Sequence, residues 1–315
     1  MYYIGVDIGG MSIKTGIVDE SGKILTSSVI ETEKIQPEKQ IEKIANQIEK
    51  LIEDFNVKKC EIVGVGVGCP GAIDVRNGVV KSSSNLKWTE LPLKCLLEES
   101  LGLKVRVAND ADCATLGEVL FGAGKGYSNA VMLTLGTGVG GGVVLNGKLY
   151  EGPFGMASEL GHITLKMGGE PCGCGRSGCF EQYASASALI RISKEKMLEN
   201  RSSKMWEYCQ NDLDKVNGKT AFDCAKNGDF TANLVVDEYV ENLSEGMLNY
   251  CNIFRPELII IGGGISKEGD YLISKVKSYM QKYNYGYLGS PKCEIIVAKL
   301  RNDAGIIGAS ALVME

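Results

Sequence analysis

One histidine and three cysteines at short spacing form the first group of residues that could do chemistry. His162 stands ten positions before Cys172, and Cys174 and Cys179 follow within seven more residues. One imidazole and three thiolates complete a tetrahedral zinc site, which is structural because no coordination position remains for a reactive water. The alternative is a set of free cysteines, of which the chain has 11 in all. The interleaved glycines favour zinc, because they let a short loop wrap around one ion.

Three glycine-rich segments each follow an apolar run, and each could bind phosphate. Backbone N–H groups in such segments can approach anionic oxygens closely. None of the three matches the P-loop pattern or the dinucleotide-binding fingerprint. Each alone could be an ordinary turn, but three in one chain predict a phosphate site. The candidate residues are Asp7, Gly9, Gly10, Ser12, Lys14, Gly136, Thr137, Gly138, Gly140, Gly262, Gly263 and Gly264.

Asp110 is the candidate general base. It follows Asn109 at the end of an apolar run and opens an expected helix. The alternative is a helix cap, because Asn and Asp are favoured there. As a functional group, it would be a carboxylate at the carboxyl end of a strand, where open α/β folds place their sites. The helix N-terminus would keep it ionised and able to accept a proton from a substrate hydroxyl.

Two glutamates flank the cysteine motif. Glu159 precedes His162 by three positions, and Glu181 follows Cys179 by two. A loop folded around a metal would bring the two carboxylates close together. With the imidazole they could hydrogen-bond sugar hydroxyls. The alternative is that each glutamate is a solvated surface charge.

Hydrophobic patterning predicts an α/β protein that positions these groups. The expected strands cover 2–7, 14–18, 24–32, 61–67, 105–108, 130–135, 143–145, 257–261 and 293–298. The expected helices cover 37–55, 181–199, 232–254 and 271–283, with a last one from about 304. Residues 200–230 give no clear pattern. The similar glycine-rich turns after two strands suggest duplicated halves facing one cleft.

Composition narrows the class of protein. A length of 315 residues suggests about two domains, and 44% hydrophobic residues suffice for two cores. The net charge of −5, without a Lys/Arg cluster, gives no nucleic-acid-binding face. No run reaches the roughly 18 apolar residues of a membrane span, and the first residues do not resemble a signal peptide. Scattered cysteines, odd in number, suggest reduced thiols and a cytoplasmic location.

Together these segments resemble the ROK family of bacterial sugar kinases and sugar-responsive repressors. The most specific resemblance is Glu159-x-Gly-His162 followed by Cys172-x-Cys174-Gly-x-x-Gly-Cys179-x-Glu181. The resemblance implies an actin/hexokinase-like (ribonuclease H-like) α/β fold, with two domains, an interdomain cleft and a zinc loop at 162–181. The expected small domain covers 1–108 and is completed by the C-terminal helix at about 303–315. The expected large domain covers 109–302.

The resemblance also implies an ATP-dependent hexose kinase. Asp110 would take the proton from the sugar's primary hydroxyl as that oxygen attacks the γ-phosphate of ATP, with Mg²⁺ stabilising the charge. The glycine segments would hold ATP, and Asp7 would face Mg²⁺ through water. The implied sugar-binding residues are Asn85, Asn109, Asp110, Glu159, His162 and Glu181. His162 would bind zinc through one nitrogen and reach the sugar with the other.

Two residues depart from the family pattern, and several alternatives stay open. Met11 replaces the usual threonine of the first glycine segment, and Asp112 replaces a frequent asparagine. A second carboxylate near Asp110 could raise the pKa of Asp110.

Glucose is the sugar expected, with N-acetylmannosamine, mannose, allose, fructose or a β-glucoside as alternatives. A homodimer is expected. A sugar-sensing ROK protein is the main alternative function; Asp7 leaves no room ahead of it for the repressors' DNA-binding segment. The third hypothesis is an α/β protein that zinc stabilises and whose cleft has no catalytic activity.

Overall fold

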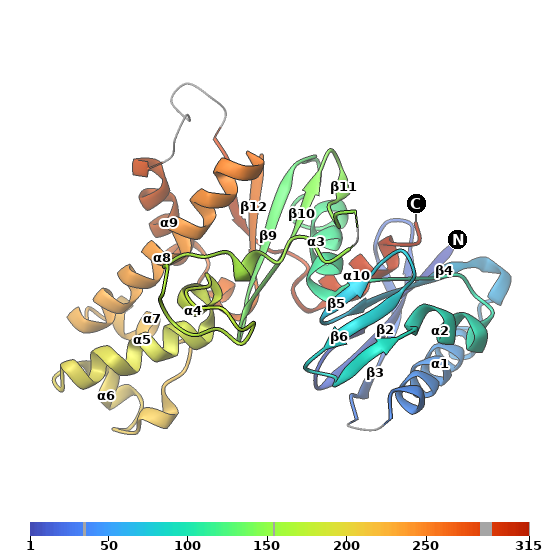
Figure 1. The fold of residues 1–315 in the computed structure, drawn as a ribbon, viewed down its shortest axis with the longest axis horizontal. Coiled ribbons are helices and arrows are strands. Elements are labelled where there is room, and N and C mark those ends of the chain that lie inside the picture. The colour runs from blue at the N-terminus through green and yellow to red at the C-terminus, as the bar shows by residue number, and fades with distance from the viewer. Residues whose placement is uncertain (34–35, 154, 284–291, 315) are drawn as a thin grey trace. The chain divides into compact units, whose positions relative to one another are not determined.

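The computed structural model describes residues 1–33, 36–153, 155–283 and 292–314 (Figure 1). The chain divides into two compact units. Unit 1 comprises Met1–Ala130, Gly142–Ser158 and Lys299–Glu315, and unit 2 comprises Val131–Gly141 and Glu159–Ala298. Among the described residues, no helix is both long and apolar enough to cross a membrane.

A five-stranded sheet forms the centre of unit 1. Its order is β3-β2-β1-β4-β8, with bounds β1 (Tyr2–Ile8), β2 (Ser12–Asp19), β3 (Ile24–Glu31), β4 (Ile62–Cys69) and β8 (Val105–Asn109). The first three strands are antiparallel, and β4 and β8 continue the sheet in parallel with β1. Parallel neighbours bring the ends of β1, β4 and β8 to one edge, which is where Asp7 and Asn109 lie.

Four helices cover this sheet. α1 (Pro37–Asp54) and α2 (Leu93–Leu101) pack against each other, and α3 (Asp110–Phe121) packs against α10 (Ala304–Ala311). The apolar residues of α1 recur at helical spacing and are buried, and Pro37 occupies the first turn. α10 lies so close to the sheet that a Cβ on Gly5 would be 1.9 Å from the carbonyl oxygen of Ile306. Only glycine permits that approach.

A small second sheet also belongs to unit 1. Its order is β5-β6-β7, with β5 (Ala72–Asp74), β6 (Val79–Ser83) and β7 (Trp88–Leu91). These three strands and α2 were missed by the sequence patterning, because strands of three to five residues give too few alternations for a periodic signal.

A second five-stranded sheet repeats the order of the first. It runs β11-β10-β9-β12-β13, with β9 (Ala130–Leu135), β10 (Val139–Leu145), β11 (Lys148–Leu149), β12 (Leu258–Gly262) and β13 (Glu294–Val297). In both sheets, the third strand in chain order lies at one edge, followed by the second, first, fourth and fifth. The shared order agrees with the expected duplication.

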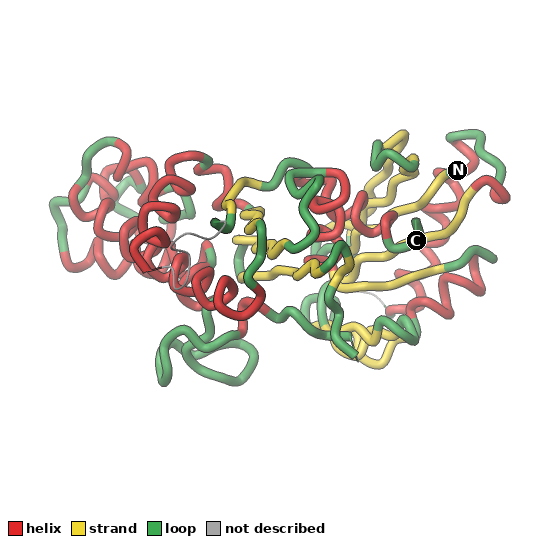
Figure 2. Tube along the Cα trace, turned by 90° about the horizontal axis from the view of Figure 1, so that it is seen from above, coloured by secondary structure: helices red, strands yellow, loops and turns green. Residues whose placement is uncertain are grey.

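The remaining described α-helices belong to unit 2. They are α4 (Glu181–Ala184), α5 (Ala186–Glu199), α6 (Lys204–Tyr208), α7 (Thr220–Lys226), α8 (Phe230–Phe254) and α9 (Asp270–Tyr283). The chain also has 3₁₀ turns η1 (Lys59–Glu61), η2 (Leu160–His162), η3 (Leu213–Lys215), η4 (Gly264–Glu268) and η5 (Arg301–Asp303). The tube view shows that helix predominates in unit 2 away from its strands (Figure 2).

Two expectations differ from the structure. The single helix expected over 181–199 is interrupted at Ser185, whose side chain accepts a hydrogen bond from the Ala188 N–H and begins α5 as its N-cap. The division into units also differs from the expected ranges 1–108 and 109–302. α3 belongs with unit 1 because it packs tightly on α10, where a Cβ on Gly308 would be 1.6 Å from the Cys113 carbonyl oxygen.

Candidate functional site

The first glycine segment is the tight turn between β1 and β2. The Gly9 N–H donates to the carbonyl oxygen of Ser12 at 2.9 Å, and the Thr32 hydroxyl donates to the carbonyl oxygen of Gly9 at 2.7 Å. Gly10 is exposed, and Met11 beside it is 88% exposed. The side chain of the methionine that replaces the family's threonine is therefore largely exposed, and the two hydrogen bonds at Gly9 hold the turn.

Asp7 lies beneath this turn at the end of β1. Its carboxylate lies 3.8 Å from the Lys14 ammonium, and it packs against Gly305, where a Cβ would be 2.6 Å from the carboxyl carbon of Asp7. Desolvation raises the pKa of Asp7, and Lys14 partly opposes that rise. Lys14 also donates to the carbonyl oxygen of Asn302 at 3.4 Å. Only glycine fits at position 305, because a side chain there would collide with the carboxylate.

Asp110 is the first residue of α3, as expected. Asn109 caps this helix: its Oδ1 accepts the Ala111 N–H at 2.8 Å and the Asp112 N–H at 3.4 Å. The Asn109 amide donates to the carbonyl oxygen of Gly71 at 3.0 Å. The capping interpretation of Asn109 is therefore correct, and the cap holds Asp110 in place. The Asp110 carboxylate is half-buried and accepts the Ala111 N–H at 3.0 Å.

Asp112 takes a different position from Asp110. It is buried, and a Cβ on Gly142 would be 3.0 Å from the Asp112 Oδ1 and 2.5 Å from the Thr115 hydroxyl. The close packing shows that Asp112 is directed against β10 within unit 1.

Asn85 lies beside the first glycine segment. Its Cβ is 4.0 Å from the place that a Cβ on Gly10 would take. Both residues line a hollow of about 170 Å³ in unit 1, together with Thr32 and Trp88. The structure thus brings one predicted sugar-binding residue together with one predicted phosphate-binding residue.

The second glycine segment, in unit 2, is held from both sides by the chain that follows the cysteine motif. The Ala186 N–H donates to the carbonyl oxygen of Gly136 at 2.8 Å, and the Ser187 hydroxyl donates to that of Thr137 at 2.8 Å. The Val139 N–H donates to the Glu181 Oε2 at 3.0 Å. A Cβ on Gly138 would lie 2.1 Å from that same oxygen, so only glycine fits beside it. Gly140 follows within β10.

The third glycine segment lies beside the second. A Cβ on Gly263 would be 2.4 Å from the carbonyl oxygen of Leu135, the residue that precedes Gly136. Gly263 also has φ +82°, a left-handed conformation that favours glycine. Gly262 ends β12, and Gly264 is exposed with open space around it. β9 and β12 are neighbours in the sheet, which explains why the two segments meet.

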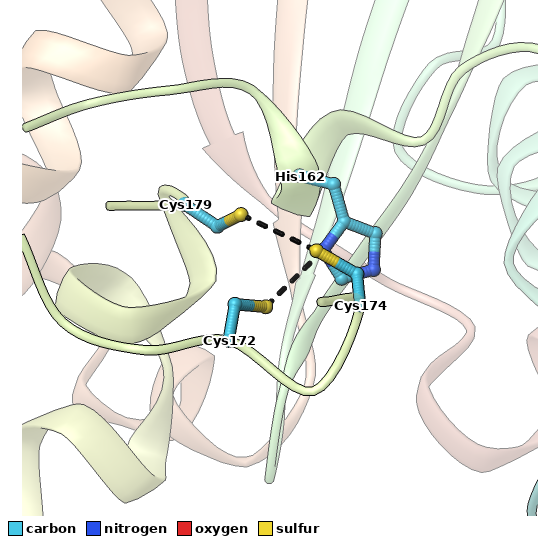
Figure 3. Close-up of side chains that lie close together, drawn as sticks. All are labelled: His162, Cys172, Cys174 and Cys179. Atoms are coloured by element: carbon cyan, nitrogen blue, oxygen red, sulfur yellow. Dashed lines mark hydrogen bonds between the residues drawn. The ribbon is translucent and has the colours of Figure 1, made fainter. Parts of the chain in front are cut away.

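The cysteine motif folds into one cluster, shown in Figure 3. The ligand atoms of His162, Cys172, Cys174 and Cys179 all lie within 4.8 Å of one another. The His162 Nδ1 is 3.6 Å from the Cys172 Sγ, and the Cys174 and Cys179 sulfurs are 3.6 Å apart. For Zn–S and Zn–N bonds of about 2.3 and 2.0 Å, tetrahedral geometry puts ligand atoms roughly 3.5–3.8 Å apart. The cluster therefore has the ligand types and spacings that zinc requires.

Three buried aromatic residues fix this loop to the rest of unit 2. The Tyr250 hydroxyl donates to the carbonyl oxygen of Leu160 at 2.5 Å, and the Tyr183 hydroxyl accepts the Glu170 N–H at 2.8 Å. Phe180 is fully buried and packs on Gly246, where a Cβ would be 2.2 Å from the ring. These contacts join the loop to α8.

The two glutamates and the histidine are neighbours, as expected from the sequence. Desolvation raises the pKa of Glu159; the nearby Glu181 adds to that rise, and His162 opposes it. The Glu181 Oε1 lies 3.8 Å from the Cys172 sulfur. Glu181 thus contacts the cysteine cluster with one oxygen and the second glycine segment with the other.

Comparison with known proteins places this arrangement in a family. The sequence pattern that defines the ROK family matches residues 3–315. The chain belongs to the ROK family. Its resemblance through the cysteine motif is thereby confirmed, and so is the expected α/β fold of sugar kinases.

Individual relatives cover nearly the whole chain. A protein named glucokinase from Halalkalibacterium halodurans is 39% identical over 319 aligned residues, covering 100% of this chain and 95% of the relative. The crystal structure of a ROK family glucokinase from Streptomyces griseus, in complex with glucose and AMPPNP, is 34% identical. It covers 99% of both chains with a TM-score of 0.82. A xylose repressor from Caldicellulosiruptor bescii is 30% identical over 99% of this chain and 78% of the repressor.

Sequence reasoning missed Ser187 and the backbone N–H of Val139. Val139 lies inside the second glycine segment but differs in type from its candidate residues, and a serine after a helix cap carries no signal of its own. Their role depends on the packing of α5 against a loop about 50 residues earlier, which only the tertiary structure reveals.

Proposed function

We propose that this protein is an ATP-dependent hexose kinase that phosphorylates glucose. The observation that supports this most strongly is the likeness over the whole chain to glucokinases, one of them in complex with glucose and AMPPNP. The structure describes every candidate residue for phosphate and sugar binding. Each unit carries at least one of the three glycine segments.

Asp110 is the proposed general base. Its carboxylate is fixed at the N-terminus of α3 by the Asn109 cap and remains half-buried. A positioned carboxylate can take the proton of the sugar's primary hydroxyl as that oxygen attacks the γ-phosphate. Asp7 is proposed to face the Mg²⁺ that accompanies ATP, through water. The proposed sugar contacts are Asn85, Asn109, Glu159, His162 and Glu181.

The glycine segments are the proposed ATP site. In unit 1, Gly9 and Gly10 would hold phosphates. Ser12 and Lys14, which follow them in the chain, are the other candidate contacts there. Gly136, Thr137, Gly138 and Gly140 would hold phosphates in unit 2, and Gly262, Gly263 and Gly264 would lie along the adenosine. Backbone N–H groups at such turns are suitable for binding anionic oxygens.

The cysteine cluster is proposed to hold one structural Zn²⁺. Four protein ligands would fill its coordination sphere, so the ion would stabilise the loop and leave chemistry to the carboxylates. Since the His162 Nδ1 faces Cys172, the other ring nitrogen is the one left to meet a sugar hydroxyl.

The homodimer expected from the resemblance stays a prediction, which light scattering would test.

A coupled assay of ADP release, with MgATP and a panel of hexoses and N-acetylhexosamines, tests the function. Turnover should require sugar and be fastest with glucose. If turnover is fastest with another sugar, the proposed kinase activity stands and the proposed substrate is replaced by that sugar. A second candidate, a sugar sensor, is favoured by the likeness to the xylose repressor. Sugar binding without any ADP release would support that sensor and contradict the kinase.

A further inference from the structure

Thr32 contacts the first glycine segment through two of its polar groups. Its hydroxyl donates to the carbonyl oxygen of Gly9 at 2.7 Å, and its backbone N–H donates to the carbonyl oxygen of Met11 at 3.0 Å. Thr32 directly follows β3 and belongs to no glycine-rich segment, so no sequence pattern marks it. One residue outside the segment therefore holds two of its carbonyl groups.

These two bonds orient backbone N–H groups of the segment. In a trans peptide, the carbonyl of one residue and the N–H of the next point in opposite directions, and none of the described peptide bonds is cis. Because the Gly9 carbonyl points at Thr32, the Gly10 N–H points away from it. The Met11 carbonyl directs the Ser12 N–H in the same way. Among the residues that the structure describes, the Gly10 N–H has no hydrogen-bond acceptor.

The Thr32 hydroxyl also takes the place of a backbone hydrogen bond across the turn. Residues that flank a two-residue turn commonly exchange two such bonds. Here the Gly9 N–H donates to the Ser12 carbonyl oxygen at 2.9 Å, but the Gly9 carbonyl accepts the Thr32 hydroxyl. Ser12 stands opposite Glu31 at a non-hydrogen-bonded position, because the adjacent pair, Met11 and Thr32, is the bonded one. The Ser12 N–H is thereby left for an outside acceptor.

The chain at Thr32 is itself anchored to α1. The Glu33 N–H donates to the Gln40 Oε1 at 2.9 Å, and Gln40 is buried. The Glu33 carboxylate pairs with the Lys43 ammonium on the same helix. The glycine segment has little packing of its own, since Met11 is largely exposed. Thr32 therefore joins an exposed segment to a helix that packs on the sheet.

Building on the proposed kinase function, we propose that Thr32 is a positioning residue for ATP. Its two hydrogen bonds present the N–H groups of Gly10 and Ser12 on one side of the segment, where both can donate to a phosphate. Donors that are already oriented bind at a smaller cost in conformational entropy. The hydroxyl should therefore contribute to ATP affinity and little to the chemical step. Ser187 has the corresponding part in unit 2, where its hydroxyl donates to the Thr137 carbonyl oxygen.

Thr32→Val tests this role, because it removes the hydroxyl and keeps the branched shape and the N–H. With varied ATP and saturating glucose, we expect the KM for ATP to rise about fivefold, the usual effect of one lost hydrogen bond. The kcat and the KM for glucose should each change by less than about twofold. Thr32→Ser keeps the hydroxyl and should recover most of the ATP affinity.

Thr26→Val is the matched control. Thr26 lies on the same strand and is likewise half-buried, but it stands opposite Ile17, away from the glycine segment. Its KM for ATP should equal that of the wild type. Circular dichroism and thermal unfolding verify that each variant is folded. Calorimetric titration with MgAMPPNP measures the affinity of the nucleotide site without turnover.

The outcomes separate this role of Thr32 from the kinase function. Equal MgAMPPNP affinity in Thr32→Val and the wild type would contradict the role alone, and so would a Thr32→Ser variant as weak as Thr32→Val. A raised KM for glucose with an unchanged KM for ATP would place Thr32 at the sugar and also contradict it. A wild type that binds MgAMPPNP and releases no ADP with any sugar would contradict the function alone, and weaker binding in Thr32→Val would still support the role. No MgAMPPNP binding in the wild type would contradict both.

Discussion

The carboxylate of Glu181 accepts a hydrogen bond from the backbone N–H of Val139 at 3.0 Å. Its other oxygen lies 3.8 Å from the Cys172 sulfur. One side chain therefore connects the cysteine cluster to the second glycine segment, 42 residues earlier in the chain. Ser187 and Ala186 add two more hydrogen bonds to the same segment. The segment proposed to bind phosphates thus takes its shape from the chain that follows the cysteine cluster.

Ser187→Ala should raise the KM for ATP about fivefold and leave kcat nearly unchanged. The variant removes one hydrogen bond, worth about 1 kcal/mol, that holds the Thr137 carbonyl. Steady-state kinetics with varied ATP and saturating glucose measures the effect. The control is Ser274→Ala, an exposed serine on α9 that also donates to a backbone carbonyl, at 3.2 Å. An unchanged KM for ATP in Ser187→Ala would show that the contact does not position the segment.

Asp110→Asn should lower kcat by a factor of about 10² to 10⁴, the usual contribution of a general base. The amide keeps the size of the side chain and loses the ability to take a proton. Glucose affinity, measured by intrinsic fluorescence or calorimetry, should change much less than kcat. Asp74→Asn, at the β5–β6 turn, is a matched control away from the proposed site. Normal turnover in Asp110→Asn would exclude it as the base.

Cys179→Ser should remove the bound metal and lower the melting temperature. Cys179 is fully buried within the cluster, so the loss of its thiolate would remove one of the four ligands that join the ends of the loop. Metal analysis of the purified wild type should give about one zinc per chain, and a strong chelator should lower its melting temperature similarly. Cys60→Ser, at an exposed cysteine, should change neither value. A metal-free wild type with full stability would contradict the zinc proposal.

Asp7→Asn should stabilise the fold at neutral pH while lowering activity. Desolvation raises the pKa of Asp7 from its ordinary value of 3.8, so the ionised form is disfavoured in the folded state. The wild type is thus free of this penalty below pH 3.8 and loses stability as pH rises through the raised pKa. The stability gain of the variant should shrink as pH falls toward that value. Urea denaturation at several pH values measures it, and a gain independent of pH would refute the explanation.

Glu118→Gln should destabilise the protein by about 2–4 kcal/mol. The Glu118 side chain is fully buried and accepts the N–H groups of Ala123, Lys299 and Leu300 at 2.8, 3.0 and 2.5 Å. An amide replaces one acceptor by a donor and would face an N–H group. Equilibrium unfolding in urea measures the loss. Glu38→Gln, in the exposed first turn of α1, should change stability by less than about 0.5 kcal/mol.

The sequence by itself determined the family, most of the longer elements and the cluster of one histidine and three cysteines. α1 and α8 were predicted closely because long periodic patterns record which face of a helix is buried. The cysteine cluster was predictable because its four ligands lie within 18 residues, where spacing alone limits the geometry. The start of α3 at Asp110, with Asn109 as its cap, was predictable because a strand ending in a capped helix is a local event.

Only the tertiary structure decided how these parts act on one another. The packing of α3 on α10 depends on contacts between segments far apart in the chain. The break at Ser185 and the short strands β5, β6 and β7 are local, but they are too brief to leave a periodic pattern. Residues such as Ser187 and Glu118 belong to no motif, because their partners are remote in the chain. Local sequence records burial and turn chemistry, whereas hydrogen bonds and charges shared between distant segments exist only after the chain has folded.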